Sequence, residues 1–174
     1  ALIFGAGPMG CLLIQAVRRA GAGRIAVVDQ QAWRLGLAAK LGATETITAD
    51  EHLARRLRAL EPRGFDVVVD ATGVPAVIES LFDYAKARAK IWLFGVAPIG
   101  TRVKIPAYDV FRKDWKIIGS FAVNRTFPQS IALIESGAIQ VEPLISHRLP
   151  LADFAAGMEI VQHDPKRVKV QFEL

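Results

Sequence analysis

The residues with the clearest chemical meaning stand near the start of the chain, in the run Gly5-Ala6-Gly7-Pro8-Met9-Gly10. This run fits the pattern G-x-G-x-x-G, in which the three glycines have different tasks. Gly5 permits a tight turn, Gly7 lets a phosphate approach the backbone, and Gly10 lets a helix pack closely on a strand. A helix starting at Pro8 would offer free N–H groups to an anion. The run predicts a turn that binds pyrophosphate; the alternative is a turn with a purely structural role.

A single acid gives the second chemical signal. Asp29 closes an apolar segment about 20 residues beyond the glycine run, where a carboxylate can bind the hydroxyls of an adenosine ribose. It would repel a 2′-phosphate, which favours NAD over NADP. Gln30 and Gln31 follow it, and neither is basic, whereas Arg34 could attract a 2′-phosphate instead. The competing role for Asp29 is to cap a helix that begins near Gln31.

Small residues close two later segments, Asp70-Ala71-Thr72-Gly73 and Phe94-Gly95-Val96-Ala97-Pro98. Ligands of open α/β sheets bind beyond the carboxyl ends of the strands, where small residues leave room for a cofactor. We therefore expect a group of small residues to lie at the site: Ala71, Thr72, Gly73, Gly95 and Val96. Ordinary turn formation is the other explanation. Asp70 is expected to be a structural hydrogen-bonding residue rather than a catalyst.

Alternating strands and helices are expected to position these turns. The predicted strands cover 1–5, 24–29, 45–48, 65–71, 90–96 and 116–122, and the predicted helices cover 8–20, 32–41, 51–60, 75–85 and 106–112. Continuous apolar runs suit parallel strands that are covered on both faces. The pattern predicts an α/β Rossmann fold, a doubly wound parallel six-stranded sheet in the order 3-2-1-4-5-6 with helices on both faces.

The character of the sequence changes after Gly137. Residues 142–150 are extended and punctuated by prolines, a short amphipathic helix is expected over 152–162, and an alternating strand over 168–172. We therefore expect a dinucleotide-binding domain over residues 1–140 and a separate C-terminal segment over residues 141–174.

Composition excludes several classes of protein. The chain of 174 residues is 52% hydrophobic and 22% charged, as in globular domains, and no apolar run reaches the roughly 20 residues that span a bilayer. The net charge of +5 is spread over separate groups, so we expect solvated faces and no nucleic-acid partner. The single cysteine, Cys11, rules out an intramolecular disulfide and suits a reducing, cytoplasmic setting.

Taken together, these segments resemble the zinc-type medium-chain dehydrogenase/reductase family, especially its sorbitol, polyol and threonine dehydrogenase branch. The similar stretches occur in the right order over nearly the whole chain, at 5–10, 27–29, 40–44, 66–73 and 143–151. The resemblance implies that Pro8 and Met9 contact the pyrophosphate, and that Asp29 and Arg34, with Gln30 beside them, hold the adenosine ribose. It also implies that Gly95 and Val96 run beneath the nicotinamide ribose, with Ser120 and Phe121 near the nicotinamide.

The resemblance further implies hydride transfer between an alcohol or polyol and NAD. The family's zinc is bound by an N-terminal catalytic domain that nothing here matches, and the candidate ligands in this chain, Cys11, His52, His147 and His163, lack ligand spacing. We therefore expect no metal and no catalytic residue in this chain, and no activity from it alone. The residues 116–122 and 103–105 are expected to support a homodimer through the edge of the sixth strand.

Two other functions stay open. The chain opens directly in an apolar strand at Ala1–Phe4, which suggests a part of a longer protein; a free-standing NAD sensor is the alternative. A zinc-free, NADPH-dependent domain of the quinone-reductase type is the second alternative, and the acid at Asp29 counts against it.

Overall fold

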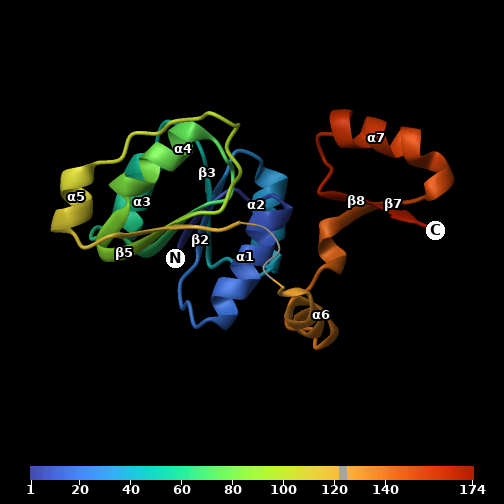
Figure 1. Ribbon diagram of the computed structural model, residues 1–174, viewed down its shortest axis with the longest axis horizontal. Coiled ribbons are helices and arrows are strands. Elements are labelled where there is room, and N and C mark those ends of the chain that lie inside the picture. The colour runs from blue at the N-terminus through green and yellow to red at the C-terminus, as the bar shows by residue number, and fades with distance from the viewer. Residues whose placement is uncertain (122–124) are drawn as a thin grey trace.

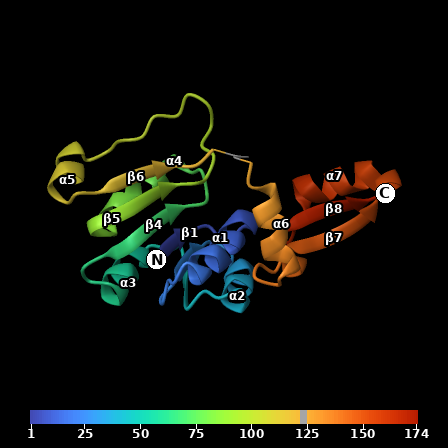
Figure 2. The same ribbon diagram turned by 60° about the horizontal axis from the view of Figure 1, so that its bottom comes forward.

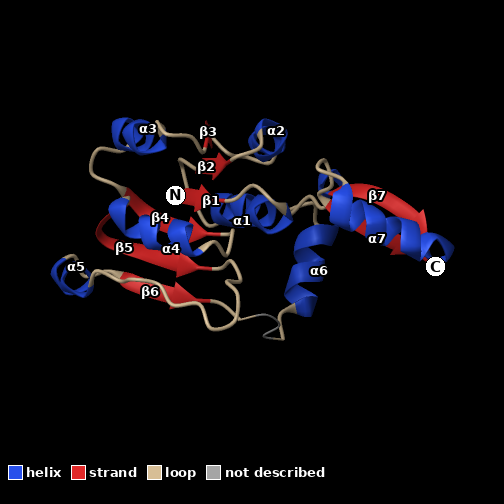
Figure 3. Cartoon of the chain, turned by 90° about the horizontal axis from the view of Figure 1, so that it is seen from above, coloured by secondary structure: helices blue, strands red, loops and turns tan. Residues whose placement is uncertain are grey.

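The computed structural model describes residues 1–121 and 125–174 of the chain. Its main sheet (Figure 1) has six strands, and Figure 3 shows their order, β3-β2-β1-β4-β5-β6, so the predicted Rossmann order is confirmed. The strands are β1 (Leu2–Phe4), β2 (Ala26–Asp29), β3 (Glu45–Thr48), β4 (Phe65–Asp70), β5 (Ala85–Leu93) and β6 (Lys116–Gly119). All neighbouring strands in this sheet are parallel.

Helices cover both faces of this sheet (Figure 3). They are α1 (Pro8–Arg19), α2 (Ala32–Lys40), α3 (Leu53–Leu60), α4 (Pro75–Ser80), the short 3₁₀ turn η1 (Leu81–Asp83) and α5 (Ala107–Arg112). Because side chains alternate between the faces of a strand, β1 divides the core in two. Its Leu2 and Phe4 pack with Leu57 of α3, whereas Ile3 packs with Ile14 of α1.

The central strands have continuous apolar sequences because both of their faces are buried. Ile3 of β1 lies in register with Val27 of β2 on one side and Val69 of β4 on the other. All three side chains are fully buried. A strand covered on both faces has no polar face, so the period-2 alternation of a half-exposed strand is absent.

Several element boundaries differ from the prediction. The predicted strand 90–96 begins five residues earlier, at Ala85, and ends at Leu93. It ends there because the N–H groups of Phe94 and Gly95 both donate to the carbonyl of Asp70, which turns the chain out of the sheet. The predicted helix 75–85 stops as α4 and η1, because Ala85 already pairs with Phe65 in the sheet.

Two more boundaries concern the sixth strand and the third helix. The predicted strand 116–122 is β6, which ends at Gly119, and Ala122 lies outside the described residues. The predicted helix 51–60 begins at Leu53. The Asp50 carboxylate accepts the N–H of His52, which holds a turn in front of the helix.

The C-terminal part has its own small sheet (Figure 2). This part of the chain contains α6 (Phe127–Glu135), η2 (Glu142–Leu144), β7 (Ile145–Pro150), η3 (Leu151–Asp153), α7 (Phe154–His163) and β8 (Lys169–Glu173), and the sheet consists of β7 and β8. The strand expected at 168–172 has a neighbour within the chain, because β8 pairs with β7 in parallel. Side chains of β8 alternate between exposed and half-buried, as the sequence pattern predicts.

Helix α6 is absent from the sequence-based prediction. None of its side chains is buried among the described residues. Phe127 is 65% exposed and Ile131 is 50% exposed. Pro128 stands in the first turn of α6, where a helix tolerates it, whereas a proline in the sequence favours a turn or a loop.

A polar clamp joins the two parts of the chain. The side-chain amide of Gln15 on α1 donates to the carbonyl of Gln140 at 3.0 Å and accepts the N–H of Gln140 at 2.7 Å. Beside it, Leu144 packs with the buried Cys11 and Leu41. The clamp satisfies a buried amide in both directions and fixes residues 140–144 against α1.

No helix in the described ranges has both the length and the apolar character needed to cross a membrane.

The contact between Gly10 and Gly5 is expected to be indispensable for stability. A Cβ atom on Gly10 would lie 1.9 Å from the backbone carbonyl oxygen of Gly5, so Gly10→Ala must push α1 away from β1. We expect about 1–3 kcal/mol lower free energy of unfolding, measured by urea denaturation. Gly36→Ala is the matched control, because its site on α2 is open. That variant should gain up to about 1 kcal/mol; equal effects of the two variants would contradict the packing argument.

The buried thiol predicts a pH dependence. Burial, reinforced by the charge of Asp29, raises the pKa of Cys11 from 9.0 to about 11. Above pH 9 the unfolded chain ionises this thiol while the folded chain does not, so stability is retained below pH 9 and lost towards pH 11. Between about pH 8 and 10.5 the wild type should lose up to about 2 kcal/mol more than Cys11→Ala in urea denaturation. Parallel losses in both proteins would contradict this account.

Candidate functional site

The glycine turn joins the end of β1 to the start of α1. Gly5 has φ +102°, a conformation that side chains rarely adopt, and Gly10 packs against its carbonyl. These two findings confirm the predicted tasks of the first and third glycines. Gly7 is the N-cap of α1, and a Cβ there would meet nothing within 4 Å. The turn is closed on the inside by Gly10 and open on the outside at Gly7.

The first turn of α1 leaves backbone donors available. The first four N–H groups of any helix have no partner within the helix, and Pro8 has none to offer. The N–H of Cys11 donates to the carbonyl of Gly7 at 2.9 Å. The amides of Met9 and Gly10, together with the positive end of the helix dipole, therefore favour an anion beside Gly7.

Asp29 at the end of β2 fixes the position of the glycine turn. Its Oδ2 accepts the N–H of Ala6 at 2.8 Å, and its Oδ1 accepts the N–H of Gln31 at 2.9 Å. The cap of α2 is Gln31, so the alternative in which Asp29 caps this helix is wrong. The carboxylate instead links the first two crossovers of the sheet, and it stays partly exposed at their junction.

Asp70 shapes the ends of β4 and β5. Its buried carboxylate accepts the N–H and the hydroxyl of Thr72, at 2.9 and 2.6 Å, and the N–H of Gly73 at 3.1 Å. A Cβ on Gly73 would lie 2.2 Å from the carbonyl oxygen of Val96, and a Cβ on Gly95 would lie 2.3 Å from the nitrogen of Gly73. Asp70 is therefore structural, as expected, and both glycines are required by close backbone approach.

A cavity of about 550 Å³ lies at the carboxyl ends of the strands, beside the open side of the glycine turn. Its walls include seven of the residues predicted for the site, which are Gly5, Gly7, Asp29, Gln30, Arg34, Ala71 and Thr72. This is the crevice in which ligands of open α/β sheets bind.

Other predicted site residues lie outside this cavity, namely Pro8, Met9, Gly10, Gly73, Gly95, Val96, Ser120 and Phe121. Val96 and Phe121 are 93% and 98% exposed, beyond the ends of β5 and β6. The hydroxyl of Ser120 accepts the indole N–H of Trp92 at 2.7 Å. The structure does not bring these three residues into contact with the glycine turn.

Some walls of the cavity were missed by the sequence analysis: Gln31, Ala49, Val74, Val77, Pro165 and Arg167. Pro165 and Arg167 come from the loop between α7 and β8, more than 130 residues beyond Asp29 in the sequence. The basic residues at 166–169 form one of the separate charged groups that the sequence predicts to lie on solvated faces. Only its position in the fold reveals that one member, Arg167, is half-buried at a cavity.

Two guanidinium groups and one carboxylate set the charge of the cavity. Arg34 lies over the ring of Trp33, with its Cζ atom 5.1 Å from the ring centroid, which restricts its position. Arg167 is held by the carbonyl of Asp164, which accepts from its Nη1 at 3.1 Å. The cavity thus offers the guanidinium groups of Arg34 and Arg167 for phosphates, and the carboxylate of Asp29, at the end of β2, as an acceptor for hydroxyls.

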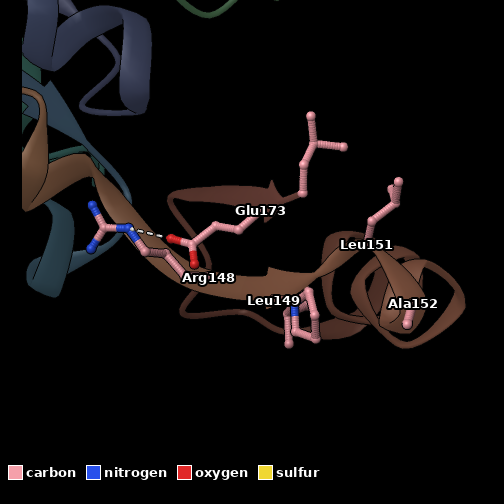
Figure 4. Close-up of a pocket in the computed structure, with 7 residues that line it drawn as sticks. Arg148, Leu149, Leu151, Ala152 and Glu173 are labelled. Atoms are coloured by element: carbon pink, nitrogen blue, oxygen red, sulfur yellow. Dashed lines mark ion pairs between the residues drawn. The ribbon is translucent and has the colours of Figure 1, made fainter.

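A second hollow of about 550 Å³ lies at the far end of β7 and β8. Figure 4 shows Arg148 and Glu173 facing each other across the two strands, with an Nε–Oε1 distance of 3.5 Å. Leu149 and Leu151 form much of the remaining wall. Its one charged pair is already neutralised, and no glycine turn lines it, so we do not assign it a ligand.

Metal ligands were also considered. Within residues 1–121 and 125–174, no three His, Cys, Asp or Glu side chains come together as a metal-binding group. The described side chains therefore do not fit a zinc ion, and no chemical step in this chain is assigned to one.

Known proteins resemble this chain over its whole length. The D-altritol 5-dehydrogenase of Agrobacterium fabrum is 33% identical over 172 residues, which cover 99% of this chain and 50% of that protein. The L-threonine 3-dehydrogenase of Bacillus velezensis is 33% identical, with 93% of this chain and 48% of that protein covered. The chain thus spans about half the length of the curated relatives that it matches.

A solved structure agrees with these relatives. The NADP-bound structure of a Sinorhizobium meliloti protein, described as a zinc-binding dehydrogenase, superposes with a TM-score of 0.87 at 29% identity. The match covers 97% of this chain and 50% of that one. The family described as "Zinc-binding dehydrogenase" matches residues 8–136, which include the last three residues of the glycine turn and all the strands of the main sheet after β1. The chain therefore belongs to the zinc-binding dehydrogenase family.

Proposed function

We propose that this chain is the dinucleotide-binding part of an NAD-dependent alcohol or polyol dehydrogenase. One observation carries the proposal: Gly7, at the N-terminus of α1, opens onto a cavity that it shares with Asp29. Membership of the zinc-binding dehydrogenase family supports the same function. A free-standing NAD sensor would need the same cavity, so the two hypotheses differ in chemistry and not in the ligand.

The pyrophosphate would lie beside Gly7. The amides of Met9 and Gly10 would donate to it from the first turn of α1, and Arg167, which lines the same cavity, would add a positive charge. Gly7 is the position where a side chain would occupy the space that the phosphates need. The close contact between Gly5 and Gly10 would hold the turn in place.

The adenosine ribose would bind at Asp29, with Gln30 and Arg34 beside it. Both carboxylate oxygens already accept a backbone N–H, and each keeps a free lone pair for a ribose hydroxyl. We propose NAD rather than NADP, because a 2′-phosphate would lie against this carboxylate. Two observations favour NADP instead: Arg34 could attract a 2′-phosphate, and the Sinorhizobium meliloti relative binds NADP.

The nicotinamide would extend from the cavity along the ends of β4 and β5. Ala71 and Thr72 line the path, and beside it the backbones of Gly73, Gly95 and Val96 approach one another closely. Ser120 and Phe121 would lie at the far end. The nicotinamide supplies the hydride chemistry when it is bound, and the residues of this chain would orient it.

Further features of the parent protein follow the same proposal. Residues 1–140 would form the nucleotide-binding domain, and residues 141–174 would continue into the other half of the enzyme. The edge strand β6 exposes Ile117 and Ile118 by 37% and 38%, which suits pairing with a second copy in a homodimer. A free, buried thiol at Cys11 suits a reducing, cytoplasmic setting.

Titration of the chain with NAD in a calorimeter tests the proposal directly, with Gly7→Ala as the decisive variant. The added methyl group meets no protein atom within 4 Å, so the fold should be unaffected while the phosphate site is partly filled. We expect an unchanged Tm and a Kd for NAD at least about tenfold higher. Gly23→Ala, at another open position, should change neither. A Gly7→Ala variant that binds NAD like the wild type would disprove this site.

The charge of Arg167 predicts a salt effect on binding. Arg167→Gln removes a cation from the cavity wall, so NAD should bind about three- to tenfold more weakly, and its Kd should respond less to added NaCl. Lys166→Gln is the matched control, because Lys166 is exposed on the same loop and is not part of the wall. The same titrations with NADP compare the two cofactors; tighter NADP binding would overturn the choice of NAD.

A further inference from the structure

The loop that carries Arg167 is held from two sides. On the α7 side, the carbonyl of Asp164 accepts the N–H of Arg167 at 3.3 Å and its Nη1 at 3.1 Å. On the β8 side, the N–H of Val168 donates to the hydroxyl of Ser146 at 2.9 Å. The position of the guanidinium therefore depends on Asp164 and on the start of β7.

Asp164 is itself fixed through its carboxylate. Its Oδ1 accepts the N–H of Lys166 at 2.7 Å, which closes a tight turn at the end of α7. Its Oδ2 lies 3.3 Å from Nε2 of His147 on β7. Both side chains are less than one-third exposed, so water screens this pair less than it screens the surface pairs of the chain.

His147 is in turn oriented by its neighbour. Its Nδ1 lies 2.9 Å from the hydroxyl of Ser146, and this hydroxyl donates its proton to the carbonyl of Lys169 at 3.1 Å. Ser, His and Asp side chains in this order could suggest a nucleophile. The serine hydroxyl, however, is engaged by backbone groups at Val168 and Lys169, so it serves to join β7 to β8.

We infer that His147 is a positioning residue for the dinucleotide site: through Asp164 it holds the loop that presents Arg167 to the cofactor phosphates. The inference rests on the proposed function, because it assumes that Arg167 contacts the bound dinucleotide. His147 itself is not part of the cavity wall and acts only through the loop. Its contribution therefore exists only while Arg167 is present.

A double-mutant cycle in the 174-residue chain tests this dependence. NAD affinity is measured by calorimetry for wild type, His147→Gln, Arg167→Gln and the double variant. We expect His147→Gln to raise the Kd about three- to tenfold, and to have no further effect once Arg167 is replaced. His163→Gln is the matched control, because His163 is exposed on α7 and pairs only with Glu159 among the described residues.

The possible outcomes are distinct. If the two effects add, His147 acts independently of Arg167 and the inference is wrong. If His147→Gln binds NAD as tightly as wild type while Arg167→Gln does not, the inference fails and the proposed function stands. If wild type itself does not bind NAD, the proposed function fails as well. Should His147→Gln not fold, Asp164→Asn breaks the same pair from the other side and enters the same cycle.

Discussion

The whole site depends on one contact between backbones, the approach of Gly10 to the carbonyl of Gly5. No side chain can be placed in this contact, so α1 starts directly on the end of β1. This fixes the direction of the helix axis and hence of its free amides. It also places Ala6 where its N–H can reach Asp29, so the second strand is aligned with the first crossover. The cavity is a consequence of this alignment.

The buried carboxylate of Asp70 has a similar role on the other half of the sheet. A buried acid is tolerated when hydrogen bonds satisfy it, and Thr72 and Gly73 provide them. These hydrogen bonds hold the chain after β4 in a compact turn. The backbone at Gly95, after the end of β5, packs directly against the backbone of this turn at Gly73. Asp29 and Asp70 both close a strand and both bind the backbone of the turn beside it. The floor of the cavity is therefore rigid, whereas its cations lie on longer, partly exposed side chains.

The sequence predicted the sheet order, most of the helices and the glycine turn, because each depends on local patterns. Glycine spacing, continuous apolar runs and an acid at the end of a strand are all visible within about thirty residues. The errors have physical causes. Helix α6 has a proline in its first turn, and a proline in the sequence favours a turn or a loop. The ends of β5 are set by bonds to Asp70 and by pairing at Phe65. Arg167 was missed because nothing near it in the sequence indicates that residues 145–173 fold back towards Asp29.

That fold-back has a consequence for the synthesis of the protein. Walls of one cavity come from Phe4 at one extreme and Arg167 at the other, so most of the chain must leave the ribosome before the cavity is complete. The glycine turn and the first three strands are made much earlier and can pair while translation continues. A nascent chain would thus present an incomplete cavity until the loop with Pro165 and Arg167 docks beside Asp29.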